Sequence, residues 1–299
     1  MPNVQLPEYP FTPKSIDLAG LKMSYLDEGP PPEAEAETFL MVHGNPTWSY
    51  YYRHLVMGLS DRYRCIVPDH IGMGLSDKPD DSKYPYSLER RIADLDRLIE
   101  HADIKGPINL VVHDWGGMIG TSWAVDHPDR IKRMIVLNSG AFHLPPSKPL
   151  PWQLRLCRTP LLGSLLVRGF NGFVRDAMTS CVNRKAFKQE VADAFASPYD
   201  SWANRRSIMR FVQDIPLSRS HRSWQRVTET QDKLPVLESI PKIFCFGMKD
   251  FVFDKHFLDT WTLYFPDAPV YRFEDCGHYI LEDAGDEVLE RIEAFVKTS

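Results

Sequence analysis

A carboxylate stands at the tip of a tight turn in the run His113-Asp114-Trp115-Gly116-Gly117. The apolar stretch Ile108–Val112 before it predicts a buried strand, and Met118–His127 after it predicts a helix that ends before Pro128. This pattern of strand, turn and helix is typical of a nucleophile elbow, in which the residue at the tip is usually serine. A carboxylate in that place usually attacks an alkyl carbon and forms an alkyl ester, so Asp114 predicts covalent catalysis. Taken alone, the motif fits equally well an aspartate that caps the following helix.

Two further residues complete a catalytic arrangement with Asp114. An aspartate nucleophile needs a base for the second half of its reaction and an acid that orients this base. Asp250 follows the apolar strand Ile243–Phe246, and His278 follows Val270–Phe273. Each alone fits a turn residue or a buried histidine, but the order of acid and then histidine after the elbow is that of elbow enzymes. Because the carboxyl ends of parallel strands meet at one edge of a sheet, we expect the three side chains to meet there.

The loop after the predicted strand Arg133–Leu137 is a second place where an acid can stand in enzymes of this type. Its residues Asn138–Ala141 include no carboxylate. Asp250 is therefore the predicted acid.

Alternating strand and helix patterns position these residues. Buried strands and amphipathic helices alternate over 38–137 and again over 243–299, behind an N-terminal hairpin at 15–27. The alternation predicts an α/β fold with a mostly parallel, doubly wound sheet and helices on both faces. The intervening segment opens with four prolines and shows helical stretches without a strand pattern. We therefore expect two core segments, at 1–141 and 222–299. A helical cap at 142–221 is expected to be inserted between them, after the sixth strand.

The composition is that of a globular protein with no feature of nucleic-acid binding. The 299 residues are 43% hydrophobic and 25% charged, which suits one α/β domain with an insertion, and the net charge is −5. The first ten residues have no secretory signal pattern, and no apolar run approaches the roughly 20 residues of a membrane span. The five cysteines are scattered without metal-type spacing. We expect a cytoplasmic enzyme without a metal or an organic cofactor.

Five motifs give the chain a resemblance to a known family over nearly its full length. It resembles the α/β-hydrolases of the haloalkane dehalogenase-like group, and within them the third subfamily. The resemblance implies the α/β-hydrolase fold and two neutral donors, Asn45 and Trp115, that hold the leaving anion in a dry pocket. The motifs are His43–Thr47, Asp69–Pro79, His113–Gly117, Gly247–Asp250 and Gly277–Tyr279.

Neighbouring families with an aspartate elbow fit the sequence less well. Epoxide hydrolases usually carry an aromatic residue where this chain has Asn45, and they need cap tyrosines, for which the predicted cap offers only Tyr199. Fluoroacetate dehalogenases place arginine after the nucleophile, where this chain has Trp115.

The run from His43 to Trp48, followed by Ser49–Arg53, is especially similar to the β-lactone decarboxylases of long-chain olefin biosynthesis. That resemblance implies the conversion of a cis-3-alkyl-4-alkyl-oxetan-2-one into a cis-alkene and carbon dioxide. Two alternatives stay open. One is a haloalkane dehalogenase that forms alcohol and halide, and the other is a ligand-binding protein without activity.

Two routes through Asp114 are compatible with lactone decarboxylation. In the first, the carboxylate attacks the ring alkyl carbon and expels the ring carboxylate, which Asn45 and Trp115 hold before anti elimination releases carbon dioxide. Inversion followed by anti elimination gives a cis-alkene from a cis-lactone. In the second, attack at the carbonyl carbon gives a mixed anhydride.

The predicted cap is both apolar and basic. Its apolar side chains are expected to line a tunnel for long alkyl chains, although ordinary helix packing also explains them. Its basic side chains usually form a solvated face, but they also suit a membrane surface or a partner, such as the other olefin-biosynthesis enzymes in an assembly. The apolar set is Leu161, Leu162, Leu165, Leu166, Val167, Phe170 and Phe173. The basic set is Arg155, Arg158, Arg168, Arg175, Arg184, Lys185, Arg205, Arg206 and Arg210.

Overall fold

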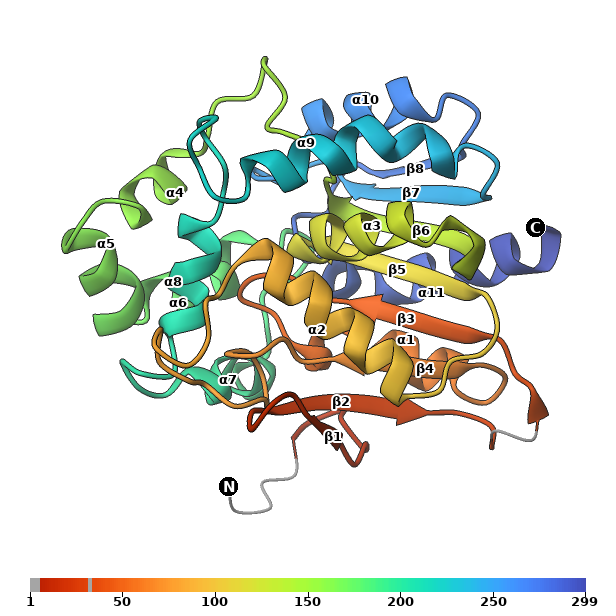
Figure 1. Ribbon diagram of the computed structural model, residues 1–299, viewed down its shortest axis with the longest axis horizontal. Helices are drawn as coiled ribbons and strands as arrows, with labels where there is room; N and C mark the ends of the chain where they lie inside the picture. Colours follow the sequence, from red (N-terminus) through yellow and green to blue (C-terminus); the bar gives the residue numbers. More distant parts are fainter. Residues whose placement is uncertain (1–5, 32–33) are drawn as a thin grey trace.

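A computed structural model describes residues 6–31 and 34–299, so the first five residues of the predicted core segment 1–141 lie outside the described residues. The described chain forms one eight-stranded sheet in the order β1-β2-β4-β3-β5-β6-β7-β8 (Figure 1). Strand β2 is antiparallel to β1 and β4, and all other neighbours are parallel. The predicted hairpin and the mostly parallel sheet are confirmed. The strands are β1 (Lys14–Asp17), β2 (Lys22–Glu28), β3 (Thr38–Val42), β4 (Arg64–Pro68), β5 (Ile108–Asp114), β6 (Ile131–Ser139), β7 (Lys242–Gly247) and β8 (Val270–Phe273).

Helices cover both faces of the sheet. On one face α1 and α11 pack together, and on the other α2, α3 and α9 pack in series (Figure 1). Strand β5, which carries the elbow, is buried along its whole length because it lies between these layers. The flanking helices are η2 (Ser49–Tyr52), α1 (Arg53–Leu59), α2 (Leu88–His101), α3 (Trp115–Asp126), η3 (Pro128–Arg130), α9 (Trp224–Lys233), η6 (Leu234–Leu237), α10 (Lys255–Tyr264) and α11 (Ile280–Thr298).

The segment 142–221, which we expected to form the cap, holds short helices that lie beyond the carboxyl ends of the parallel strands, at the left of Figure 1. Helix α9 follows this segment and packs on α3 of the core. The helices of the segment are α4 (Trp152–Cys157), α5 (Leu162–Ser164), the π-helix η4 (Leu165–Gly169), α6 (Gly172–Ser180), α7 (Gln189–Ala196), η5 (Ser197–Tyr199) and α8 (Arg206–Gln213). Within the described ranges, no helix is long and apolar enough to cross a bilayer.

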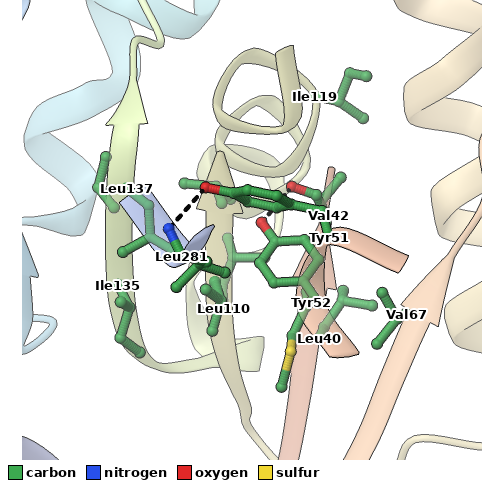
Figure 2. Close-up of a cluster of buried hydrophobic side chains, with 14 of the residues drawn as sticks. Leu40, Val42, Tyr51, Tyr52, Val67, Leu110, Ile119, Ile135, Leu137 and Leu281 are labelled. Atoms are coloured by element: carbon green, nitrogen blue, oxygen red, sulfur yellow. Dashed lines mark hydrogen bonds between the residues drawn. The ribbon is translucent and has the colours of Figure 1, made fainter. Parts of the chain in front are cut away.

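Two buried tyrosines fix the turn after β3 against the core. Tyr51 and Tyr52 pack on aliphatic side chains of the sheet (Figure 2). The Tyr52 hydroxyl donates to the backbone oxygen of Val42 at 2.9 Å, and the Tyr51 hydroxyl accepts from the backbone nitrogen of Leu281 at 3.5 Å. Both buried hydroxyls are therefore partnered, and the bonds tie η2 to the end of β3 and to the first turn of α11. Helix α11 begins two residues after His278, so the core that holds η2 also positions the predicted base.

Candidate active site

Asp114 occupies a strained turn between β5 and α3. Its backbone angles are φ 52° and ψ −128°, and helix α3 begins at the next residue, Trp115. The Asp114 side chain makes no capping bond to the helix, so the capping interpretation is wrong. The helix begins three residues before the predicted Met118, because the two intervening glycines weaken the helix signal in the sequence. This geometry is that of a nucleophile elbow.

Glycines allow the close approach that the elbow requires. A Cβ atom on Gly44 would overlap the Asp114 carboxylate, and one on Gly116 would overlap the backbone oxygen of Val42. The strand end and the turn after β3 therefore pack directly against Asp114, the predicted nucleophile. A side chain at either glycine would displace the Asp114 carboxylate or its helix.

The structure brings Asp114, Asp250 and His278 together at the carboxyl ends of β5, β7 and β8. The Nδ1 atom of His278 donates to the Oδ2 atom of Asp250 at 2.7 Å. On the other side of the ring, Nε2 lies 3.5 Å from the Oδ2 atom of Asp114. All three side chains are buried. The predicted order of nucleophile, acid and histidine therefore forms one connected triad.

The two carboxylates control the charge of His278. Burial by itself favours the neutral ring, but the charges of Asp250 and Asp114 and their hydrogen bonds outweigh it and raise the pKa of His278 to about 10. The imidazolium is therefore the resting form at neutral pH. In this form His278 is a fixed positive charge beside Asp114 and cannot accept a proton.

The amide of Asn138 contacts Asp250, a role that no sequence pattern predicts. Its Nδ2 atom donates to Asp250 Oδ2 at 3.0 Å and to the backbone oxygen of Gly247 at 3.0 Å. Its Oδ1 atom accepts from the Gly247 nitrogen at 2.7 Å. Near the end of β6, where some related enzymes have an acid, this chain therefore has a neutral partner of the acid that follows β7.

Asn45 and Trp115 both line the cavity above Asp114. The backbone nitrogen of Asn45 donates to Asp114 Oδ1 at 2.6 Å. One side-chain N–H of Asn45 donates to the backbone oxygen of Ile208 on α8 at 3.3 Å, which leaves the second N–H of the amide for a ligand. The half-buried Trp115 ring packs against Phe211, with the ring centres 5.5 Å apart. The two predicted anion donors thus lie beside the nucleophile.

A largely apolar cavity of about 310 Å³ opens from the triad toward the cap. Asp114, His278 and Asn45 lie at its polar end. Aliphatic and aromatic side chains of the core and the cap form most of the remaining wall, which suits an apolar substrate with a small polar centre. They include Met118, Phe142, Leu144, Leu150, Leu154, Leu156, Leu166, Phe173, Val212, Ile215, Val227, Phe251, Val252, Phe253 and Phe257.

The predicted tunnel residues are mostly not in this wall. Of the seven, Leu166 and Phe173 line the cavity. Val167 is buried but does not line the cavity. The other four predicted residues are exposed on the surface, so the prediction is wrong for them as well. The prediction depended on apolar character alone, and a tight turn before α5 and a π-helix after it turn several of these side chains outward. The exposed residues are Leu161, Leu162, Leu165 and Phe170.

Tyr199 is fully buried outside the cavity. Its hydroxyl lies 3.4 Å from the backbone oxygen of Thr47 and 3.4 Å from the backbone nitrogen of Gly74. Among the described residues that line the cavity there is no tyrosine. The site therefore lacks the cap hydroxyls that an epoxide hydrolase needs to protonate an alkoxide.

Comparisons with known proteins agree with this geometry. The family model of the α/β hydrolase fold matches residues 37–285. A cis-3-alkyl-4-alkyloxetan-2-one decarboxylase of Shewanella oneidensis is 52% identical over 96% of this chain and 89% of its own. A second such decarboxylase, of Xanthomonas campestris, is 48% identical over 97% of this chain and 98% of its own. The crystal structure of a haloalkane dehalogenase of Bradyrhizobium elkani superposes with a TM-score of 0.83 at 22% identity, over 97% of this chain and 100% of that one.

Proposed function

The chain belongs to the α/β-hydrolase family and, within it, to the cis-3-alkyl-4-alkyloxetan-2-one decarboxylases, and we propose that it converts such a β-lactone into a cis-alkene and carbon dioxide. The observation that carries this proposal is the identity of about half of all residues over nearly the whole of both chains. The apolar cavity with a small polar end supports the same substrate class, because a dialkyl lactone has two hydrocarbon chains around one ester group.

In the first step, we propose that Asp114 attacks the alkyl carbon of the ring that bears the ring oxygen. The carbon–oxygen bond of the ring breaks, an alkyl ester forms on Asp114 and the released group is a carboxylate. Oxygen Oδ1 already accepts from the Asn45 nitrogen, and an ester carbonyl oxygen accepts hydrogen bonds better than an ester alkoxy oxygen does. Oδ2 is therefore the attacking atom, and Oδ1 becomes the carbonyl oxygen. The Asn45 amide and the Trp115 indole hold the released carboxylate.

In the second step, the new carboxylate leaves as carbon dioxide. Its carbon–carbon bond supplies the electron pair of the alkene, and the ester bond to Asp114 breaks to restore the Asp114 carboxylate. Negative charge therefore develops on Oδ2, 3.5 Å from the Nε2 atom of His278. The imidazolium stabilises this charge without giving up its proton. No water and no net proton transfer are needed, and the apolar wall of the cavity helps to keep water from the ester.

The fate of the Asp114 oxygens distinguishes this lyase reaction from hydrolysis. The test uses purified enzyme, a synthetic cis-dialkyl β-lactone and ¹⁸O-labelled water, with alkene measured by gas chromatography and Asp114 by peptide mass spectrometry. We expect cis-alkene, no ¹⁸O in Asp114 after many turnovers, and no alkene from Asp114→Asn. Incorporation of ¹⁸O into Asp114 would instead indicate hydrolysis of the ester.

Haloalkanes are the second substrate to test, because the anion donors Asn45 and Trp115 also suit halide. A parallel sample contains 1-bromoalkane and 1,2-dibromoalkane, with halide release as the readout. Alkene from the lactone makes any halide release a side reaction. Halide release with the lactone unchanged would overturn the proposed decarboxylation.

A further inference from the structure

The outer surface of the cap carries a group of exposed apolar side chains, which we call the cap patch and define as Leu161, Leu162, Leu165, Phe170 and Trp202. Leu161 is 87% exposed and Phe170 62%. A Cβ atom on Gly169 would meet both Leu165 and Trp202, at 3.0 and 3.6 Å, so these two side chains flank the same backbone. In Figure 1 the α5 end of the cap projects away from the sheet. Such a concentration of exposed large apolar side chains is a feature of interaction surfaces.

The surroundings of the cap patch are basic on a chain of net negative charge. From Arg130 to Arg175 the sequence contains no aspartate or glutamate, while the whole chain has a net charge of −5. The Arg168 guanidinium lies 4.5 Å from the centre of the Trp202 ring. Arg205 donates to the backbone oxygen of Arg168 at 2.6 Å.

Ion pairing separates these arginines from the other basic residues of the cap. Arg184, Arg206 and Arg210 are paired with carboxylates, the last two with Asp81. Within the described ranges, the arginines near the cap patch form no ion pair. They outnumber the two exposed carboxylates closest in sequence, Asp176 and Asp200. The unpaired arginines are Arg155, Arg168, Arg175 and Arg205, whereas Arg158 turns inward and donates to the backbone oxygens of Val212 and Gln213.

The cap patch lies on the reverse side of the cavity wall. Leu166 lines the cavity, whereas its neighbour Leu165 faces outward. On α4, Leu156 and Cys157 line the cavity, and Trp152 lies at the rim, because it lines the cavity and is also 69% exposed. The same short helices therefore separate the active site from the apolar and basic outer surface.

We propose that the cap patch docks this protein on the surface of an anionic lipid bilayer. The leucines, Phe170 and Trp202 insert among the headgroups, and the unpaired arginines contact lipid phosphates. The unpaired arginines complement the negative charge of anionic headgroups, and the aromatic and aliphatic side chains suit the interface of a bilayer. The reason for docking rests on the proposed function, since a dialkyl lactone and its alkene partition from water into lipid. Docking brings the cavity wall against the phase that holds substrate and product.

Co-sedimentation with lipid vesicles tests the proposal. The vesicles are phosphatidylcholine alone and phosphatidylcholine mixed with phosphatidylglycerol, at low and at high salt. We expect binding to the anionic vesicles only, weakened by salt, with each arginine near the surface contributing about fivefold at low salt. The double variant Leu161→Glu/Leu165→Glu should lose at least about tenfold in binding. The matched control is Leu263→Glu, because Leu263 on α10 is 82% exposed and lies outside the cap.

Three outcomes overturn the proposal. One is wild-type protein that stays in the supernatant with both kinds of vesicle. Another is an equal loss of binding in the control variant. The third is self-association without vesicles, seen by analytical ultracentrifugation and abolished in the double variant, which would make the cap patch a protein interface. Leu161→Ser, a milder change at a fully accessible position, repeats the test if the double variant folds poorly.

Activity measurements separate failure of docking from failure of the proposed function. The double variant should turn over a soluble short-chain β-lactone as the wild type does, but lose activity on a long-chain lactone carried in anionic vesicles. Equal activity of both proteins on the vesicle substrate would overturn the role of docking. If the wild type forms alkene from neither lactone, the proposed decarboxylase activity is refuted. The sedimentation result then decides whether the protein docks on lipid.

Discussion

Removing the positive charge of His278 gives the most specific prediction about this site. Asp250→Asn keeps the shape of the acid and removes its charge, 2.7 Å from the His278 ring nitrogen. Two unit charges about 4 Å apart attract by about 4 kcal/mol at an effective dielectric constant of about 20. Since about 1.4 kcal/mol corresponds to one pH unit, the substitution should lower the pKa of His278 by about three pH units. The imidazolium of the variant is then lost near neutral pH.

The pH dependence of alkene formation measures this change. If the imidazolium stabilises the departing Asp114 carboxylate, the wild-type rate should stay level through neutral pH and fall as pH approaches the His278 pKa of about 10. In Asp250→Asn the fall should come about three pH units earlier. Histidine-selective NMR of both proteins reports the ring charge directly. Asp176→Asn is the matched control, because Asp176 lines the cavity without contacting His278.

Two results would refute the reasoning. An unchanged alkaline limb in Asp250→Asn, together with a shifted His278 titration, would mean that the charge of the ring does not act in the reaction. A wild-type rate that increases as His278 loses its proton would mean that the ring works as a base, as hydrolysis requires.

Three further predictions concern the amide partner of Asp250, the buried ion pair of Arg91, and the pH dependence of stability. Asn138→Leu should lower kcat up to about a hundredfold with little change in KM, measured with soluble lactone, because Asp250 loses its 3.0 Å amide contact. Asp214→Asn should lower the free energy of unfolding in urea by about 3–5 kcal/mol, because it leaves the fully buried Arg91 without its opposite charge. The raised pKa of His278 contributes stability that is complete below about 6.5 and is lost as pH rises toward 10. Urea unfolding of His278→Gln should lack this loss.

The meeting of the three triad residues could be predicted from the sequence, because their positions follow from the order of the strands. Asp114 ends the buried strand β5, Asp250 follows the buried strand β7, and His278 follows the short, partly exposed strand β8. Parallel strands in an α/β sheet end at the same edge. The structure accordingly joins Asp114, Asp250 and His278 through contacts of 2.7 and 3.5 Å. The start of α3 was predicted too late, since the glycines that admit the close packing also weaken the helix pattern.

The cap was less predictable because its residues depart from regular periodicity. Leu165 and Leu166 are adjacent, yet one faces solvent and the other the cavity. Local composition cannot tell these faces apart where a three-residue helix runs into a π-helix. Asn138 was missed for a different reason. Its role depends on contact between neighbouring strands, and an amide carries no sequence signal for supporting a carboxylate.

The triad alone does not decide between hydrolysis and elimination, because in the proposed alkyl route both begin with the same ester on Asp114. A haloalkane leaves an ester with no electron source nearby, so only water can release it, and His278 must then accept a proton. A β-lactone leaves an ester with a carboxylate on the adjacent carbon, which releases the product by losing carbon dioxide. The imidazolium held by Asp250 suits this second route as it stands. The close superposition on a dehalogenase at 22% identity shows the shared fold, and the chemistry must be decided at the site.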